Sequence, residues 1–246
     1  MRIFALEYTF FQSLFKKAFQ INQLPTPTEE QIERFYHFCD FLLETNKITN
    51  LTAIRTEEDV IYKHFVDSAM VSAYIPPKAT VLDLGCGPGF PSLPLAILRP
   101  DITIKALDST SKKITFLNQA AELLGLKNIN GIAGRAEDAA IRKELGQFTV
   151  VVSRAVARLN VLCELCIPYL QMNGQLLAMK GSKAEEELME AEKAIQTLGG
   201  NSPKQISLTL ITETTQEFRA IIQTTKIAQT PPKYPRPYAN ILKKPL

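Results

Sequence analysis

Apolar residues follow two different patterns along the chain, and the pattern changes near residue 80. Before that point they recur at spacings of three and four, which predicts amphipathic helices over about 4–20, 27–45 and 57–74. A capping box, Thr26-Pro27-Thr28-Glu29, marks the start of the second helix. The polar stretch 46–52 predicts an ordered loop. The expected packing positions of the first helix are Phe4, Phe11, Leu14, Phe15 and Phe19.

After residue 80, short apolar runs alternate with stretches of helical length. This alternation predicts an α/β fold with a mostly parallel sheet and helices on both faces. Two last strand-like runs, 205–211 and 217–224, are joined by a short polar link and predict a C-terminal antiparallel hairpin. The other expected strands are 80–84, 102–107, 129–133, 148–153 and 175–179, and the helices between them are 89–98, 111–124, 136–144, 159–170 and 182–198.

This pattern predicts three parts. An N-terminal helical region, 1–77, packs on a body formed by 78–228. A tail, 229–246, is expected to be extended, because it holds five prolines and few apolar residues. The tail is also expected to be basic.

Composition narrows the class of protein only slightly. With 46% apolar residues the 246-residue chain can form a packed core, and a net charge of +3 permits a nucleic-acid partner without requiring one. No apolar run is long enough for a membrane span or a signal peptide, so a cytoplasmic protein is expected. We expect free thiols rather than a metal site at the four cysteines, including the Cys163-x-x-Cys166 pair.

The stretch 80–90 carries the clearest chemical signal. A strand runs into three alternating glycines and then into a helix, a unit that brings bare backbone to a small ligand. A dinucleotide loop, G-x-G-x-x-G, would place glycine where Phe90 stands. Asp83, two residues before Gly85, suits a cationic ligand, and S-adenosylmethionine carries an ammonium and a sulfonium. Asp83, Gly85, Gly87 and Phe90 therefore predict an S-adenosylmethionine site.

Two further positions indicate a nucleoside without choosing between S-adenosylmethionine and NAD. Asp108 ends the second expected strand, where an acid can accept both ribose hydroxyls. It can also cap the helix that begins near Ser111, and the two roles are compatible. Ala136 and Glu137 follow the third strand and are candidates for the adenine edge, although Glu137 alone is more typical of an ordinary helix N-terminal acid.

Taken together, the segments resemble the bacterial small-subunit rRNA guanine-N7 methyltransferases, the RsmG or glucose-inhibited division B family. The resemblance covers most of the chain, whereas the glycine loop alone would indicate only a methyltransferase. Departures from the family pattern are Cys86, Ser92 and the residues that follow Arg236. The matching segments are 50–54, 64–68, 83–91, 108–117, 134–137, 153–157, 180–181, 234–236 and 244–246.

The resemblance implies a Rossmann-like fold and methyl transfer from S-adenosylmethionine to N7 of a guanine in the 530 loop of 16S rRNA. It implies the small ribosomal subunit or its RNA as partner, and a monomer is expected. Carried over by position, the cofactor residues would be Gly85, Phe90, Asp108, Ser109, Thr110, Ala136, Glu137 and Arg154.

Guanine N7 has a lone pair and no proton, so its methylation requires alignment and exclusion of water rather than a general base. Arginine or lysine is the natural donor to the neighbouring O6. Arg154, Arg158 and Lys180 are the candidates, with a surface salt bridge as the alternative for each of them. Asn50 and His64 are candidates for orienting the base, with a structural hydrogen-bonding role as the alternative for His64.

Two other functions are weighed against this hypothesis. Phe90 and the terminal hairpin disfavour a nicotinamide-dependent oxidoreductase. A non-catalytic RNA-binding or ribosome-assembly protein on a methyltransferase fold is disfavoured by the intact glycine loop.

Overall fold

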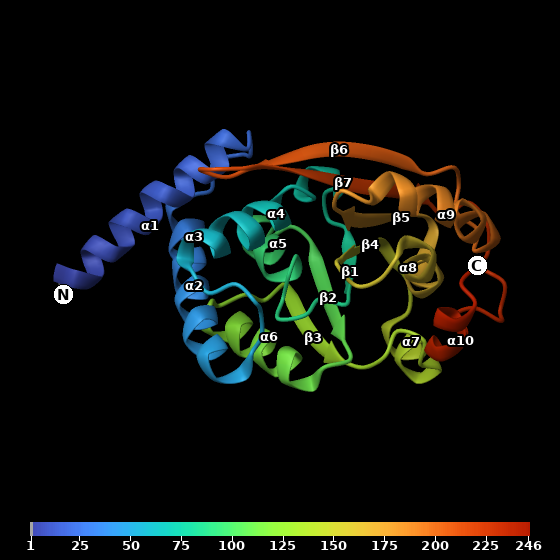
Figure 1. The fold of residues 1–246 in the computed structure, drawn as a ribbon. Helices are drawn as coiled ribbons and strands as arrows, with labels where there is room; N and C mark the ends of the chain where they lie inside the picture. The colour runs from blue at the N-terminus through green and yellow to red at the C-terminus, as the bar shows by residue number, and fades with distance from the viewer. Residues whose placement is uncertain (1) are drawn as a thin grey trace.

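The computed structural model describes the backbone of residues 2–246 and side chains from residue 7 onward, so the expected packing of Phe4 lies outside the described residues. Helices flank a seven-stranded sheet on both faces (Figure 1). The strands are β1 (Thr80–Leu84), β2 (Thr103–Asp108), β3 (Ile129–Ala133), β4 (Phe148–Arg154), β5 (Leu170–Lys180), β6 (Lys204–Ile211) and β7 (Gln216–Thr225). The helices are α1 (Arg2–Ile21), α2 (Glu29–Thr49), α3 (Glu57–Val60), η1 (Ile61–Val66), α4 (Asp67–Ala69), η2 (Ser72–Tyr74), α5 (Ser92–Leu98), α6 (Ser111–Leu123), α7 (Ala139–Leu145), α8 (Leu159–Cys166), η3 (Ile167–Tyr169), α9 (Ala184–Thr197) and α10 (Tyr238–Lys243).

The strand order is β3-β2-β1-β4-β5-β7-β6. Strands β1 to β5 pair in parallel, and β7 pairs antiparallel with both β5 and β6. The predicted α/β fold and C-terminal hairpin are therefore confirmed. The chain moves outward in opposite directions from β1 and β4, and a crevice for a ligand forms at the carboxyl ends of strands where the order switches in this way.

Side chains of β1 alternate between two hydrophobic clusters, as the period of a strand requires. Val81 belongs to the cluster shared with the N-terminal helices, and Leu82 and Leu84 belong to the cluster formed with α8 and α9. Asp83 lies on the same face as Val81. The sheet is therefore covered on one face by the N-terminal helices with α5 and α6, and on the other by α8 and α9.

The N-terminal helices differ from the prediction at their ends. Helix α2 begins at a capping box made by Thr28 and Gln31, not by Thr26 and Glu29. It continues through most of the predicted loop and ends at Asn50, which has a left-handed backbone (φ 49°). The amide of Asn46 is buried inside α2 and bonds the backbone of residues 51, 52 and 54, so the polar side chains of this stretch stabilise the turn after the helix.

In place of the single helix predicted over 57–74, the structure has four short helical segments, α3, η1, α4 and η2. In the middle lies η1, a π-helical segment over Ile61–Val66. Such wide turns occur frequently at functional sites, and this one carries His64. Two other expectations are corrected: the helix predicted over 159–170 gives way to β5 at Leu170, and part of the tail expected to be extended forms α10.

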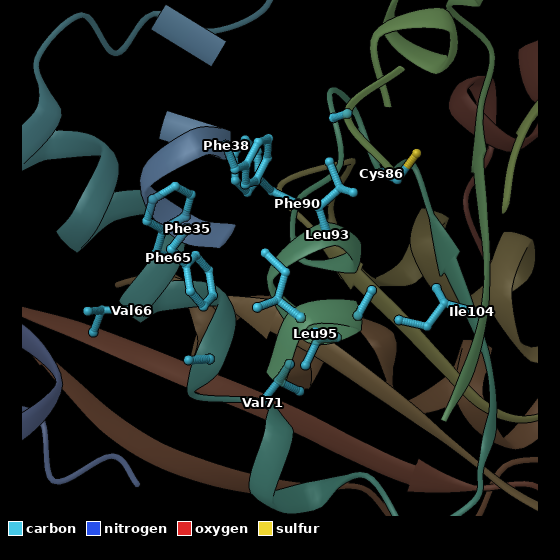
Figure 2. Close-up of a cluster of buried hydrophobic side chains, with 14 of the residues drawn as sticks. Phe35, Phe38, Phe65, Val66, Val71, Cys86, Phe90, Leu93, Leu95 and Ile104 are labelled. Atoms are coloured by element: carbon cyan, nitrogen blue, oxygen red, sulfur yellow. The ribbon is translucent and has the colours of Figure 1, made fainter. Parts of the chain in front are cut away.

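Aromatic side chains join the N-terminal helices to the glycine loop. Phe90 points from the loop into a group of rings contributed by α2 and η1 (Figure 2). Its ring centroid lies 5.4 Å from that of Phe38 and 6.4 Å from that of Phe65. The loop is therefore supported by the helical region as well as by its own strand.

Two phenylalanines of α1 provide a matched test of this packing. Phe15 is fully buried, with its ring 4.5 Å from Phe19 and 4.9 Å from Phe35, whereas Phe10 is 66% exposed. We expect Phe15→Ala to lower the free energy of unfolding by about 3–5 kcal/mol, because it removes a buried ring and leaves a cavity. Phe10→Ala should change it by no more than about 0.5 kcal/mol. Urea denaturation measures both, and equal losses would contradict the packing described.

Candidate active site

A cavity of about 1000 Å³ opens at the carboxyl ends of β1, β2, β4 and β5, and the loop after α2, η1 and β7 contribute to its walls. Its volume is at the upper end for small-molecule sites, which typically span about 300–1,000 Å³. Most residues predicted from the sequence line it, and Asn50 and Asp83 do not. Those that do are Gly85, Gly87, Phe90, Asp108, Ser109, Thr110, Ala136, Glu137, His64, Arg154 and Lys180.

The glycine loop bends back onto the neighbouring strand. The backbone N–H groups of Gly85 and Cys86 both donate to the Leu107 carbonyl, at 2.7 and 3.2 Å. Gly85 has φ +76°, and a Cβ on it would lie 2.2 Å from a methyl group of Val156. Gly87 has φ +56° with open space where a Cβ would stand. The conformation excludes side chains, so the loop presents bare backbone to the cavity.

Asp83 occupies a different place from the one predicted. It is fully buried beneath the loop, where Oδ2 accepts from the backbone N–H of Ser92 at 3.1 Å, in the first turn of α5. Among the described residues, Oδ1 has no hydrogen-bond partner. Burial raises the pKa of this carboxyl to about 7. Asp83 therefore supports the turn from loop to helix and does not line the cavity, and its predicted role in cofactor binding stays a prediction.

Asp108 is held by two backbone N–H groups; the N-cap of α6 is Thr110, and the ribose contact of Asp108 stays a prediction. Oδ1 accepts from the Thr110 N–H at 2.8 Å, just before α6, and Oδ2 accepts from the Gly87 N–H at 2.9 Å. Each carboxylate oxygen has two lone pairs, so each can still accept a further hydrogen bond from a group in the cavity. The carboxylate is held rigidly between the glycine loop and α6, as a ribose-binding acid requires.

The segment after β3 forms one end of the cavity. Asp138 is the N-cap of α7 and accepts from the backbone N–H of Ala140. The role of helix N-terminal acid, considered for Glu137, thus falls to Asp138. Glu137 accepts from Nε of Arg135 at 2.6 Å, and the Ala136 carbonyl accepts from the Tyr169 hydroxyl at 2.9 Å.

Arg154 stands at the other end, at the carboxyl end of β4, and its side chain is only 15% exposed. Nη1 donates to Asp67 Oδ2 at 2.8 Å and to the Lys63 carbonyl at 3.0 Å, and Nη2 donates to His64 Nδ1 at 3.1 Å. The guanidinium carbon lies 5.4 Å from the centroid of the Phe90 ring. These partners use three of the five guanidinium N–H groups.

His64 lies between Arg154 and Thr52. Its Nδ1 faces a guanidinium, which can only donate, so Nδ1 accepts and the neutral ring carries its proton on Nε2. Nε2 then donates to Thr52 Oγ1, at 2.9 Å. The ring stacks on Phe90 with centroids 4.0 Å apart. Burial and the charge of Arg154 lower the pKa of His64 to about 3.

The remaining candidates have structural partners. Lys180 lines the cavity but is nearly buried, and Nζ donates to the Ala157 carbonyl at 2.6 Å and pairs with Glu187 at 2.7 Å. Arg158 lies outside the cavity and pairs with two glutamates of α9, so the salt-bridge alternative holds. Asn50 is exposed, and the cavity wall begins at the next residue along the chain.

The cavity is also lined by residues that were not predicted as site residues, among them Thr52, Asp67, Arg219 and Tyr238. Asp67 has a recognisable signal, because it follows His64 by three positions on a helical segment. It is nearly buried and bridges Arg154 and Nε of Arg219, at 2.8 and 2.7 Å. Arg219 and Tyr238 come from the C-terminal third of the chain, and no local motif marks them.

Two general features of the chain complete the description. Within residues 2–246, no helix combines the length and apolarity needed to cross a bilayer. The four cysteines are buried and free, and the described residues include no group of three or more His, Cys, Asp or Glu arranged to hold a metal ion.

The strand order, the glycine loop and the cavity define a Rossmann-like methyltransferase fold. Solved structures with this fold include a methyltransferase from Pyrococcus furiosus, with a TM-score of 0.56 and 13% identity over 80% of this chain and 99% of that one. A SAM-dependent methyltransferase from Aquifex aeolicus gives a TM-score of 0.53 and 14% identity over 68% of this chain and 93% of that one. The TYW2 protein of M. jannaschii, solved in complex with AdoMet, gives 0.54 and 14%, over 66% and 75%.

Sequence comparisons identify the family. A profile described as rRNA small subunit methyltransferase G, GidB, matches residues 31–214. A protein of that name from Lachnoclostridium phytofermentans is 42% identical over 241 residues, 97% of this chain and 96% of the relative. Another, from Clostridium perfringens, is 43% identical over 221 residues, 89% and 92%. The chain belongs to the rRNA small subunit methyltransferase G family, as the resemblance predicts.

The buried His64 predicts a specific pH dependence. Its pKa is lowered from 6.5 to about 3, so below pH 6.5 the unfolded chain binds a proton that the folded protein does not. Stability is therefore intact above about pH 6.5 and falls as pH decreases towards 3, by up to about 1.4 kcal/mol per pH unit. In the His64→Gln variant, this contribution to the fall of the unfolding free energy with decreasing pH should be absent.

The same test has an internal control, because the chain has only two histidines. The side chain of His37 on α2 is 55% exposed, so His37→Gln is the exposed counterpart against which His64→Gln is compared. NMR of the imidazole nitrogens should find His64 neutral at pH 5. A protonated His64 at that pH would contradict its described environment.

Proposed function

We propose that this protein transfers the methyl group of S-adenosylmethionine to N7 of a guanine in the 530 loop of 16S rRNA. The observation that carries the proposal is a single cavity with two chemically different ends. The end formed by the glycine loop and Asp108 suits a nucleoside, and the end formed by Arg154 suits the acceptor edge of a guanine. Membership of the rRNA small subunit methyltransferase G family supports both the reaction and the RNA substrate.

The residues at the first end fit S-adenosylmethionine. Gly85 and Gly87 leave room for close approach of the ligand, and the fixed Asp108 carboxylate offers acceptors for ribose hydroxyls. The cofactor supplies an electrophilic methyl group on a sulfonium. Ser109 and Thr110 line the cavity next to Asp108, and Ala136 and Glu137 lie beyond them for the adenine.

Arg154 is the residue best placed to hold the target base. Two of its five N–H groups remain without a partner among the described residues, and its side chain borders the cavity. Donation to guanine O6 orients the base and leaves the N7 lone pair free to attack. No proton has to be removed from N7, so the methyl transfer requires no general base.

The surroundings of Arg154 fix its position before substrate arrives. Asp67 and His64 bind its two terminal nitrogens, and Phe90 lies beneath the guanidinium plane. Preorganised donors contribute most when they need not rearrange during the reaction. We assign His64 and Asp67 as positioning residues for Arg154.

The proposal extends to the partner and the location. Ribosomal RNA, free or within the small subunit, is the substrate, and a protein that modifies it works in the cytoplasm, where ribosomes assemble. We also propose that it acts as a monomer, because one chain carries both ends of the cavity.

Methyl transfer tests the proposal directly. Purified protein and S-adenosylmethionine with a labelled methyl group are incubated with 30S subunits and with naked 16S rRNA, both from cells that lack this gene. We expect one N7-methylguanine, located in the 530 loop by borohydride reduction and aniline cleavage. Bound cofactor without incorporation into either substrate would favour a non-catalytic assembly protein instead.

Arg154 and Arg158 provide a matched pair of variants, which tests whether Arg154 holds the target base. Arg154→Lys should lower the rate of methyl transfer about a hundredfold or more, because a lysine cannot bind Asp67, His64 and the base together. Arg158→Lys should change the rate by less than about twofold, since Arg158 is exposed and outside the cavity. Similar rates for the two variants would remove Arg154 from the site.

A further inference from the structure

The segment after β7 returns to the cavity. It runs from the end of β7 to α10, which lies against α8 (Figure 1). Ile241 of α10 is fully buried in the cluster that α8 and α9 form on their face of the sheet, and Tyr234 is 6% exposed in the same cluster. The segment is therefore packed on the body, although its proline-rich composition predicts an extended tail.

A buried ion pair fixes this segment to α8. Glu164 has no exposed surface, and Arg236 binds it through three donors: the backbone N–H at 2.9 Å, Nε at 2.8 Å and Nη2 at 2.5 Å. A buried carboxylate without a partner is strongly unfavourable, so the pair holds Arg236 in one place. Tyr238 follows two residues later, and its position is set by this anchor.

Tyr238 faces the cavity next to the segment after β3. It is half-buried and lines the cavity together with Gly134, Arg135, Ala136 and Glu137. The guanidinium of Arg135 lies 5.3 Å from the centroid of the Tyr238 ring and also pairs with Glu137. The ring is thus held on one side by a cation, and Arg135 connects it to Glu137.

The strand order shows which part of a ligand would reach Tyr238. Asp108 ends β2, and the neighbouring strand β3 leads into residues 134–137. On the other side of the glycine loop lie β4 and Arg154. A nucleoside with its ribose on Asp108 and its reactive end towards Arg154 therefore places its base at residues 134–137. Tyr238 lies at this same end.

We propose that Tyr238 is a cofactor-binding residue, whose ring covers the adenine of S-adenosylmethionine, and that Glu164 and Arg236 position it. This inference rests on the proposed function. Aromatic rings contribute to binding of nucleobases by stacking on their π-face, whichever edge of the base is hydrogen-bonded.

Calorimetry with two ligands tests the proposal. S-adenosylhomocysteine contains adenosine and an amino-acid part, and 5′-methylthioadenosine keeps the adenosine alone. Tyr238→Leu retains an apolar side chain but no aromatic face, and should weaken binding of both ligands by the same factor, about tenfold. Tyr238→Phe keeps the ring and should bind both within about twofold of the unsubstituted protein.

Leu242→Ala is the control on the same helix, because Leu242 is 52% exposed and does not line the cavity. It should leave both affinities unchanged. Glu164→Gln tests the anchor, and should weaken binding of both ligands by the same factor as Tyr238→Leu. The double variant, Glu164→Gln with Tyr238→Leu, should bind no more weakly than either single variant. An additive loss would show that the two residues act separately, and would overturn the positioning role of Glu164.

The outcomes separate this inference from the function on which it rests. If the unsubstituted protein binds neither ligand, the proposed cofactor is wrong and the inference fails with it. If it binds both and Tyr238→Leu binds them equally well, the proposed function stands and the inference alone is overturned. Loss of S-adenosylhomocysteine affinity with unchanged 5′-methylthioadenosine affinity would also overturn it, because Tyr238 would then contact the amino-acid part.

Discussion

The contact between Phe90 and the N-terminal helices is the constraint on which the candidate active site depends. Phe90 belongs to the glycine loop, yet its ring is 3% exposed and packs on Phe38 and His64. The same ring lies against the guanidinium of Arg154. One side chain thus supports both the glycine loop and the guanidinium of Arg154. A shift of the N-terminal helices would therefore disturb both ends of the cavity together.

The charged groups at the Arg154 end of the cavity are paired with one another. Asp67 is a single carboxylate shared by Arg154 and Arg219, while Lys180 is matched by Glu187. Arg219 also pairs with Glu217, at 2.9 Å. The two arginines and the two carboxylates Asp67 and Glu217 therefore balance in formal charge. Arg154 offers the cavity N–H donors without a partner among the described residues, and not an excess of charge.

Some parts of this structure can be predicted from local sequence and others cannot. Alternating apolar runs and the glycine loop identify the α/β fold, and Asp108 is found because the ends of adjacent parallel strands meet at one edge. The burial of Asp83 follows from the period of the strand, which puts it on the face of Val81. For α2, Thr26 and Thr28 offer overlapping capping patterns that sequence alone does not separate. The placement of Arg219 and Tyr238 depends on pairing and packing between segments far apart in the chain.

The ion pair of Glu164 and Arg236 joins residues 72 positions apart and has a consequence for the order in which the protein is synthesised. While the chain grows from its N-terminus, α8 is complete long before Arg236 exists. Until then, packing α8 would leave the Glu164 carboxylate buried without a counter-charge, which is strongly unfavourable. The cluster around α8 therefore reaches its final packing only after Arg236 has left the ribosome.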